Sequence, residues 1–181
     1  GRRPVTALPD AYDSPLHLPF NRACLDGRFT LQSPLPDAGG PGYGVLLRGS
    51  KMSVTQEQGR FALPYGEWSD APSLLLGQWQ GQPCRLVELG DADPLPEGHE
   101  MLSLLDENPL LPIDLLSLGG MGRMVLHWLN RSRFCGYCGG QAGWRSGEWG
   151  RECRSCQADA YPAIHPCAIV LVTRPGEVLL T

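Results

Sequence analysis

The fold is indicated first by the stretch CGYCGGQAGWRSGEWGRECRSC, residues 135–156. It opens with the pair Cys135 and Cys138 and closes with the pair Cys153 and Cys156, with fourteen residues between the two pairs. Each C-x-x-C pair is a short knuckle that presents two sulfurs to one ion, and two knuckles together complete a tetrahedron. The spacing therefore predicts a four-cysteine zinc ribbon.

One Zn²⁺ per chain is expected at this site, in a structural role. Four thiolates fill all four positions of a tetrahedral zinc ion, so none remains for a catalytic water. Redox-active C-x-x-C pairs or two disulfides are the alternative interpretation, but a count of seven cysteines is odd, and paired spacing favours metal in a reducing compartment. The other cysteines, Cys24, Cys84 and Cys167, are interpreted as small apolar residues of the interior.

Charge is distributed unevenly along the chain. Residues 1–115 hold eight Arg and Lys against fifteen Asp and Glu, a net charge of −7, whereas residues 116–163 hold six Arg against three acids, a net charge of +3. Four thiolates on one Zn²⁺ lower the latter to about +1. This balance favours phosphate weakly and is too small for a dedicated nucleic-acid-binding protein.

The absence of a long apolar run and of a signal-peptide pattern at the first residues predicts a cytoplasmic protein without membrane contact.

The chain before the cysteines predicts an N-terminal mixed sheet domain over residues 1–112. Residues 1–42 are rich in Pro and Gly and predict mostly loop, with one strand near residues 28–32. A first hairpin is predicted around Gly49 and Ser50, and a second joins residues 74–79 to 84–89 through residues 80–83. Residues 100–106 are expected to form a helical turn.

A connecting helix is predicted over residues 113–131. Its apolar residues recur at helical spacing, with one irregularity at Gly119 and Gly120. They are Ile113, Leu116, Met121, Met124, Val125, Trp128 and Leu129. This helix leads into the zinc ribbon, which is expected to occupy residues 132–163. Residues 164–181 then predict a strand, a turn at residues 174–177 and the start of a second strand, which is the first hairpin of a further domain.

Several of these stretches resemble the NADH pyrophosphatases of the Nudix superfamily. The resemblance rests on FCGYCGG at residues 134–140, CRSC at 153–156 and AYPAIHPCAIVLVTR at 160–174, with weaker support from LPYGEW and LGQWQGQPCRLVEL upstream. It covers about residues 43–181. It implies an α+β chain composed of a small antiparallel N-terminal sheet, a helix, the ribbon and the first strands of a truncated Nudix α/β domain.

The resemblance further implies hydrolysis of the diphosphate bond of NAD(H) to NMN(H) and AMP, removal of NAD caps from RNA, and a homodimer. Members of this family hold Mg²⁺ or Mn²⁺ with Nudix-box glutamates that include an adjacent Glu–Glu pair. The nine glutamates of this chain never form such a pair. The resemblance therefore places no catalytic residue within this chain, which is expected to be inactive by itself.

Two residues match positions that the family uses near its dinucleotide, Glu148 in the ribbon and Tyr161 just after it. A tyrosine ring can stack on a base, and a carboxylate can accept hydrogen bonds from ribose hydroxyls. A solvated acid and a lid over the ribbon are the alternative interpretations. Three arginines of the ribbon can meet phosphate, RNA or only water; they are Arg145, Arg151 and Arg154.

A zinc-ribbon adaptor that binds protein or RNA is the alternative function, because zinc ribbons serve as binding modules as well as parts of enzymes. The sequence leaves NADH, NAD-capped RNA and other dinucleotides open as substrates.

Overall fold

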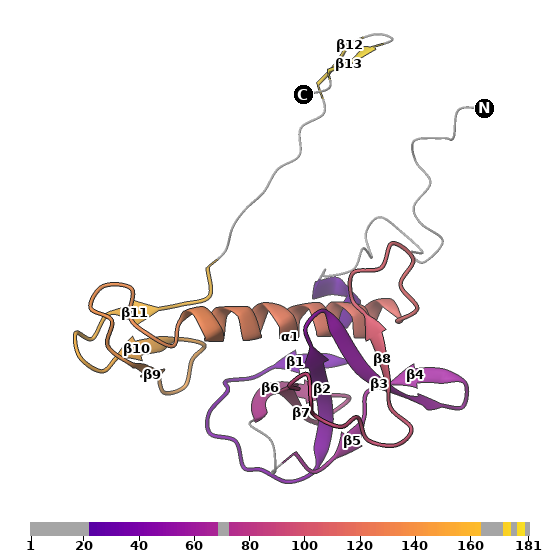
Figure 1. Ribbon diagram of the computed structural model, residues 1–181, viewed down its shortest axis with the longest axis horizontal. Helices are drawn as coiled ribbons and strands as arrows, with labels where there is room; N and C mark the ends of the chain where they lie inside the picture. The colour runs from indigo at the N-terminus through magenta and orange to yellow at the C-terminus, as the bar shows by residue number, and fades with distance from the viewer. Residues whose placement is uncertain (1–21, 69–72, 164–171, 175–176, 180–181) are drawn as a thin grey trace.

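The computed structural model describes residues 22–68, 73–163, 172–174 and 177–179. Within these ranges a sheet packs against the helix α1 (Ile113–Arg131), and the C-terminal end of α1 leads into a small three-stranded sheet (Figure 1). A short 3₁₀ helix, η2 (Arg22–Leu25), contacts α1 near the start of the described chain. The strands of the main sheet are β1 (Phe29–Leu31), β2 (Gly42–Arg48), β3 (Lys51–Glu57), β4 (Arg60–Ala62), β5 (Tyr65–Gly66), β6 (Ser73–Trp79), β7 (Gln82–Glu88) and β8 (Glu100–Ser103).

The main sheet is mixed rather than antiparallel. Its order is β1-β6-β7-β2-β3-β4, with β5 paired to β2 and β8 paired to β3. Strands β2 and β7 run parallel, from Tyr43 opposite Cys84 to Leu47 opposite Glu88. The expected antiparallel sheet is therefore wrong at its centre. Each hairpin is encoded locally by its turn, whereas the pairing of one hairpin with the other depends on residues some 40 positions apart.

Both predicted hairpins are present. The β2–β3 hairpin turns at Gly49 and Ser50. The β6–β7 hairpin turns at Gln80 and Gly81 alone, with φ angles of 50° and 78°, so Pro83 belongs to β7 and not to the loop. Two central residues with positive φ match the twist of the flanking strands, which explains why the loop is shorter than predicted.

The helical turn predicted at residues 100–106 is wrong. Glu100–Ser103 form strand β8, which pairs antiparallel with β3 so that Met52 lies opposite Leu102. Leu102 is buried in the core beside Leu104. Burial of these leucines against β3 and α1 outweighs the weak helical preference of so short a segment.

Helix α1 spans the range predicted for it, but the buried face differs from the predicted stripe. Leu115, Leu116 and Leu118 are buried, whereas Met124 is 70% exposed. The N-terminal half of α1 lies on the sheet, where a Cβ at Gly122 would meet Leu86 at 3.0 Å. The C-terminal half extends past the sheet edge toward the ribbon, which leaves its outer side exposed (Figure 1).

A buried arginine fixes the loop before β2. Arg85 on β7 is 3% exposed; its Nε and Nη2 donate to the Asp37 carboxylate, each at 2.7 Å, and it also donates to the carbonyls of Gly39 and Gly40 at 2.8 Å. The Arg85 side chain thus satisfies most of its donors within one loop. Its hydrogen bonds lower the pKa of the Asp37 carboxyl.

The C-terminal segment is described only in part. Strands β12 (Thr173–Arg174) and β13 (Glu177–Val178) pair antiparallel, as the predicted hairpin requires. Residues 1–21 and most of the predicted strand at 168–172 lie outside the described residues. None of the described helices combines the length and apolar character needed to cross a membrane.

Candidate metal centre and its surroundings

The two cysteine knuckles adopt the same local structure. In the first, the amide of Tyr137 donates to Cys135 Sγ at 3.4 Å and that of Gly139 to the Cys135 carbonyl at 3.0 Å. In the second, eighteen positions later, the amides of Ser155 and Gln157 make the corresponding bonds to Cys153 at 3.4 and 3.0 Å. The fifth residue of each knuckle has positive φ, 72° at Gly139 and 62° at Gln157.

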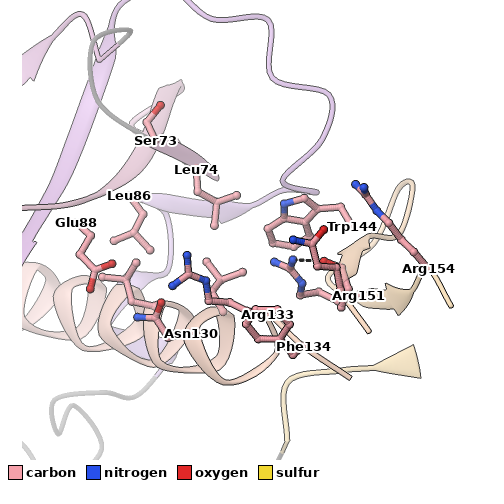
Figure 2. A pocket seen from close by; sticks show the side chains of 14 residues that line it. Ser73, Leu74, Leu86, Glu88, Asn130, Arg133, Phe134, Trp144, Arg151 and Arg154 are labelled. Atoms are coloured by element: carbon pink, nitrogen blue, oxygen red, sulfur yellow. Dashed lines mark hydrogen bonds between the residues drawn. The ribbon is translucent and has the colours of Figure 1, made fainter. Parts of the chain in front are cut away.

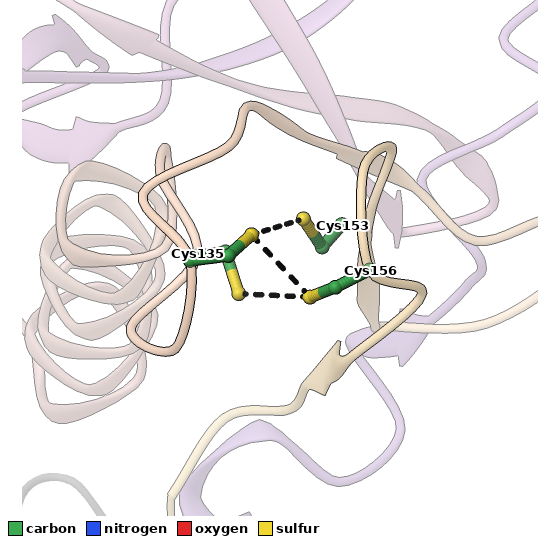
Figure 3. A group of neighbouring side chains, drawn as sticks. Cys135, Cys153 and Cys156 are labelled. Atoms are coloured by element: carbon green, nitrogen blue, oxygen red, sulfur yellow. Dashed lines mark hydrogen bonds between the residues drawn. The ribbon is translucent and has the colours of Figure 1, made fainter.

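This repeated turn brings the four sulfurs together. All four lie within 4.8 Å of one another (Figure 3). Cys138 Sγ lies 3.5 Å from Cys153 Sγ and 3.4 Å from Cys156 Sγ, and Cys135 Sγ lies 3.6 Å from Cys156 Sγ. A tetrahedron with metal–sulfur bonds of about 2.3 Å has an edge of about 3.8 Å. The cluster therefore has the size and donor set to hold a metal ion such as zinc.

Close packing of the knuckles depends on glycine at one position. A Cβ on Gly140 would lie 2.6 Å from Ser155 Oγ and 3.2 Å from Cys153 Sγ. The backbone of the first knuckle thus approaches the second more closely than a side chain permits.

Backbone amides favour the thiolate form at two of the four cysteines. Hydrogen bonds from the backbone of Cys156 and Ser155 lower the pKa of Cys153 to about 6. The pKa of Cys135 is lowered in the same way, by the backbone of Cys138 and Tyr137. Thiolates are the form that binds metal, so the knuckles prepare these two ligands.

The ribbon strands carry a second cluster of charged residues around Arg145. They are β9 (Ala142–Trp144), β10 (Arg151–Cys153) and β11 (Asp159–Ala160), in the order β11-β10-β9. Arg145 follows β9 and pairs with Glu148 at 2.6 Å and Asp159 at 2.5 Å, and more distantly with Glu152 at 3.5 Å. The pKa of Arg145 is raised by Glu148 first and then by Asp159.

The two predicted substrate residues lie next to each other in this cluster. The Tyr161 hydroxyl donates to Glu148 Oε1 at 3.3 Å, the same oxygen that accepts from Arg145 Nε. Tyr161 is 48% exposed, and it lines a hollow of about 220 Å³ together with Trp128 and Tyr137. Desolvation is the main cause that raises the pKa of Tyr161.

Tryptophans join the ribbon to the rest of the molecule. Trp144 contacts Trp128 of α1 at 5.8 Å and Trp149 at 6.1 Å between ring centroids, each edge to face. Trp149 Nε1 donates to the Gln32 carbonyl at 2.7 Å, which connects the ribbon to the segment after β1. Trp144 and Trp149 belong to the ribbon and supply apolar contacts to a module that has little core of its own.

The ribbon arginines do not share one environment. Arg145 is held by acids, whereas Arg151 lies over the Trp144 ring at 5.4 Å and donates to the Ala142 carbonyl. Burial lowers the pKa of Arg151, and the positive charges of Arg133 and Arg154 add to this effect. The sequence analysis does not single out Arg133 and Phe134, which line one cleft together with Arg151 and Arg154. The density of arginine around the first knuckle was the available signal.

Comparison with known proteins shows which family the chain is similar to. Residues 41–128, which include β2 to β8 and most of α1, match the family model of the NADH pyrophosphatase-like rudimentary NUDIX domain. Together with the relatives below, this match supports a protein of the NADH pyrophosphatase, or Nudix, type.

The relatives are enzymes described as NAD-capped RNA hydrolases. The NAD-capped RNA hydrolase NudC of Yersinia pseudotuberculosis serotype O:1b (strain IP 31758) is 32% identical over 139 residues, which cover 70% of this chain and 50% of that protein. The protein of the same name from Escherichia coli O1:K1 / APEC is 31% identical over 123 residues, which cover 65% of this chain and 45% of that protein. The chain thus spans about half the length of the curated relatives it matches.

Proposed function

We propose that this chain supplies the N-terminal sheet, the connecting helix and the zinc ribbon of a homodimeric cytoplasmic hydrolase that cleaves the diphosphate bond of NAD(H), or of NAD-capped RNA. The observation that carries the proposal is the similarity to NAD-capped RNA hydrolases, which covers 70% of this chain. The proposed division is residues 1–112, 113–131 and 132–163, followed by the first hairpin of a Nudix domain at 164–181.

The proposed role of zinc is structural. Cys135, Cys138, Cys153 and Cys156 supply four thiolates, which leave no coordination position for water or substrate. Zinc binding stabilises a module of three short strands that has little apolar interior of its own.

Mg²⁺ or Mn²⁺ would supply the charge neutralisation that diphosphate hydrolysis needs. In the described part of the chain the four cysteines are the only group of three or more Cys, His, Asp or Glu with ligand atoms close enough to hold an ion. The residues present therefore do not fit such a catalytic metal, and the proposal assigns it to the part of the enzyme that carries a Nudix box.

Glu148 and Tyr161 are proposed to contact the dinucleotide. Their side chains share a hydrogen bond and are partly exposed, and Tyr161 borders a hollow at the ribbon surface. Arg145 positions the Glu148 carboxylate by its 2.6 Å ion pair. Glu148 and Tyr161 together therefore offer one fixed acceptor and one aromatic ring.

The test is AMP release from NADH and from NAD-capped RNA. The complete gene product is expected to release AMP from NADH when Mg²⁺ or Mn²⁺ is added, and the verified 181-residue chain is expected to release none. Zinc-loaded complete protein that binds RNA but hydrolyses neither substrate would favour the adaptor function instead.

A further inference from the structure

A cleft separates the ribbon from the main sheet. It encloses about 600 Å³ and is bordered by β6 and β7, by the end of α1 and by the ribbon (Figure 2). Glu148 and Tyr161 do not line it. Its lining includes Leu74, Glu88, Arg133, Phe134, Arg151 and Arg154, and we call it the arginine cleft.

Positive charge in the arginine cleft is not balanced. Three guanidinium groups face one carboxylate, that of Glu88. In the described part of the chain, Arg28, Arg85 and Arg145 form ion pairs, but the three arginines of the cleft form none. Like charges gathered at a concave surface produce a positive potential that attracts anions.

One of these arginines is held in place by the ribbon, and a second lies close to a ribbon strand. Arg151 is fixed by the Trp144 ring and by its bond to the Ala142 carbonyl, while its Nε is buried without a hydrogen-bond partner among the described residues. Arg154 lies over β9, where a Cβ on Gly143 would meet its Nε at 3.4 Å. Figure 2 shows the Arg133 side chain between α1 and the sheet, facing the same opening. The Arg151 charge is therefore positioned before a ligand arrives.

The chemistry of the lining indicates the ligand. Guanidinium groups bind phosphate oxygens in a forked geometry, and Phe134 adds an aromatic side chain that is 60% exposed. Cationic grooves with exposed aromatic rings bind single strands, because every base offers a π-face. An acidic peptide would match the charges but would not use the ring of Phe134.

We propose that the arginine cleft binds single-stranded RNA, with Arg133, Arg151 and Arg154 contacting phosphates and Phe134 stacking on a base. The proposal rests on the proposed action on NAD-capped RNA, for which it provides a place for the nucleotides beyond the cap. Because the rest of the chain is acidic, with a net charge of −4 overall, the cleft localises the RNA rather than attracting it to the whole surface.

The test measures binding of an uncapped, fluorescein-labelled single-stranded RNA to the zinc-loaded chain by anisotropy. Three phosphate contacts predict a slope of about −2 for log K against log salt between roughly 50 and 200 mM NaCl. In the double variant Arg133→Gln/Arg154→Gln the slope should fall to about −0.7, with affinity at least about tenfold lower. The matched control Lys51→Gln/Arg60→Gln, which removes two charges from the exposed β3–β4 region, should bind as the original chain does.

A third variant separates RNA from other anions. Phe134→Leu should weaken RNA binding about fivefold or more while leaving inorganic tripolyphosphate binding unchanged. Equal affinity of the arginine double variant and the original chain would overturn the proposal, as would RNA binding that is insensitive to Phe134→Leu, or a preference for an acidic peptide. Hydrolysis of NADH by the complete protein is measured separately, so either proposal can fail alone.

Discussion

Tyr161 and Glu148 form a side-chain hydrogen bond of 3.3 Å, and Arg145 Nε donates to the same carboxylate oxygen. A residue that follows β11 is thereby joined to one in the loop between β9 and β10. Both side chains remain partly exposed, so the pair is available to a ligand.

The first prediction concerns this pair in the complete enzyme. Glu148→Ala and Tyr161→Ala should each raise KM for NADH by about tenfold, equivalent to about 1.4 kcal/mol, and leave kcat nearly unchanged, because they remove the proposed substrate contacts and not the metal ligands. Steady-state kinetics measure both constants. Glu107→Gln, an exposed acid outside the ribbon, serves as the control. Unchanged KM in both variants would assign the pair a purely structural role.

The second prediction concerns the cysteine cluster. Cys138→Ser should lose most bound zinc and unfold residues 132–163 before the main sheet, because the ribbon depends on the ion for much of its stability. Zinc content and amide NMR report the two effects. Ser146→Ala, an exposed change in the same module, should retain one zinc per chain. A variant that loses zinc yet keeps native ribbon amides would contradict the expected dependence.

The third prediction concerns a close approach of β6 to β1. A Cβ on Gly77 would overlap the Thr30 carbonyl oxygen and lie 3.0 Å from the amide of Gln32. Gly77→Ala should therefore lower the free energy of unfolding by about 3 kcal/mol or more, because the backbone itself must move. Gly81→Ala, in the same hairpin, meets nothing within 4 Å and should cost only about 1 kcal/mol for its positive φ. Urea unfolding distinguishes them.

The fourth prediction concerns the Asp37 carboxylate, whose pKa Arg85 lowers below the ordinary value of 3.8. A carboxyl with a lower pKa in the folded state adds stability above pH 3.8, and this stability is lost as pH falls through the folded pKa. Asp37→Asn should thus cost about 1.5 to 3 kcal/mol at neutral pH, with the difference shrinking below pH 4.

Urea unfolding at a series of pH values measures this difference. Asp26→Asn, which removes the same charge from an exposed site, should show little change at any pH. If the loss of unfolding free energy caused by Asp37→Asn grew as the pH falls, the Arg85–Asp37 pair would not be its cause.

Features that depend on residues close together in the sequence were predictable from it, whereas pairings between distant residues were not. The β2–β3 turn at Gly49 and the α1 range are decided by neighbouring residues, so periodicity and turn chemistry predict them. Residues 100–106 were misassigned because the partner that makes them a strand, β3, lies about 50 positions earlier. The parallel β2–β7 pairing escaped prediction for the same reason.

For the site, the sequence by itself determined the four sulfurs, because each C-x-x-C knuckle folds through bonds within five residues and the second repeats the first. Only the tertiary structure decided which charges meet. Arg145 pairs with three acids from the adjoining strands and loop, whereas Arg133, Arg151 and Arg154, which line the arginine cleft, form no ion pair with any residue that the structure describes. The physical reason is distance: charges a few ångströms apart in space decide the local potential, and their spacing along the chain does not reveal it.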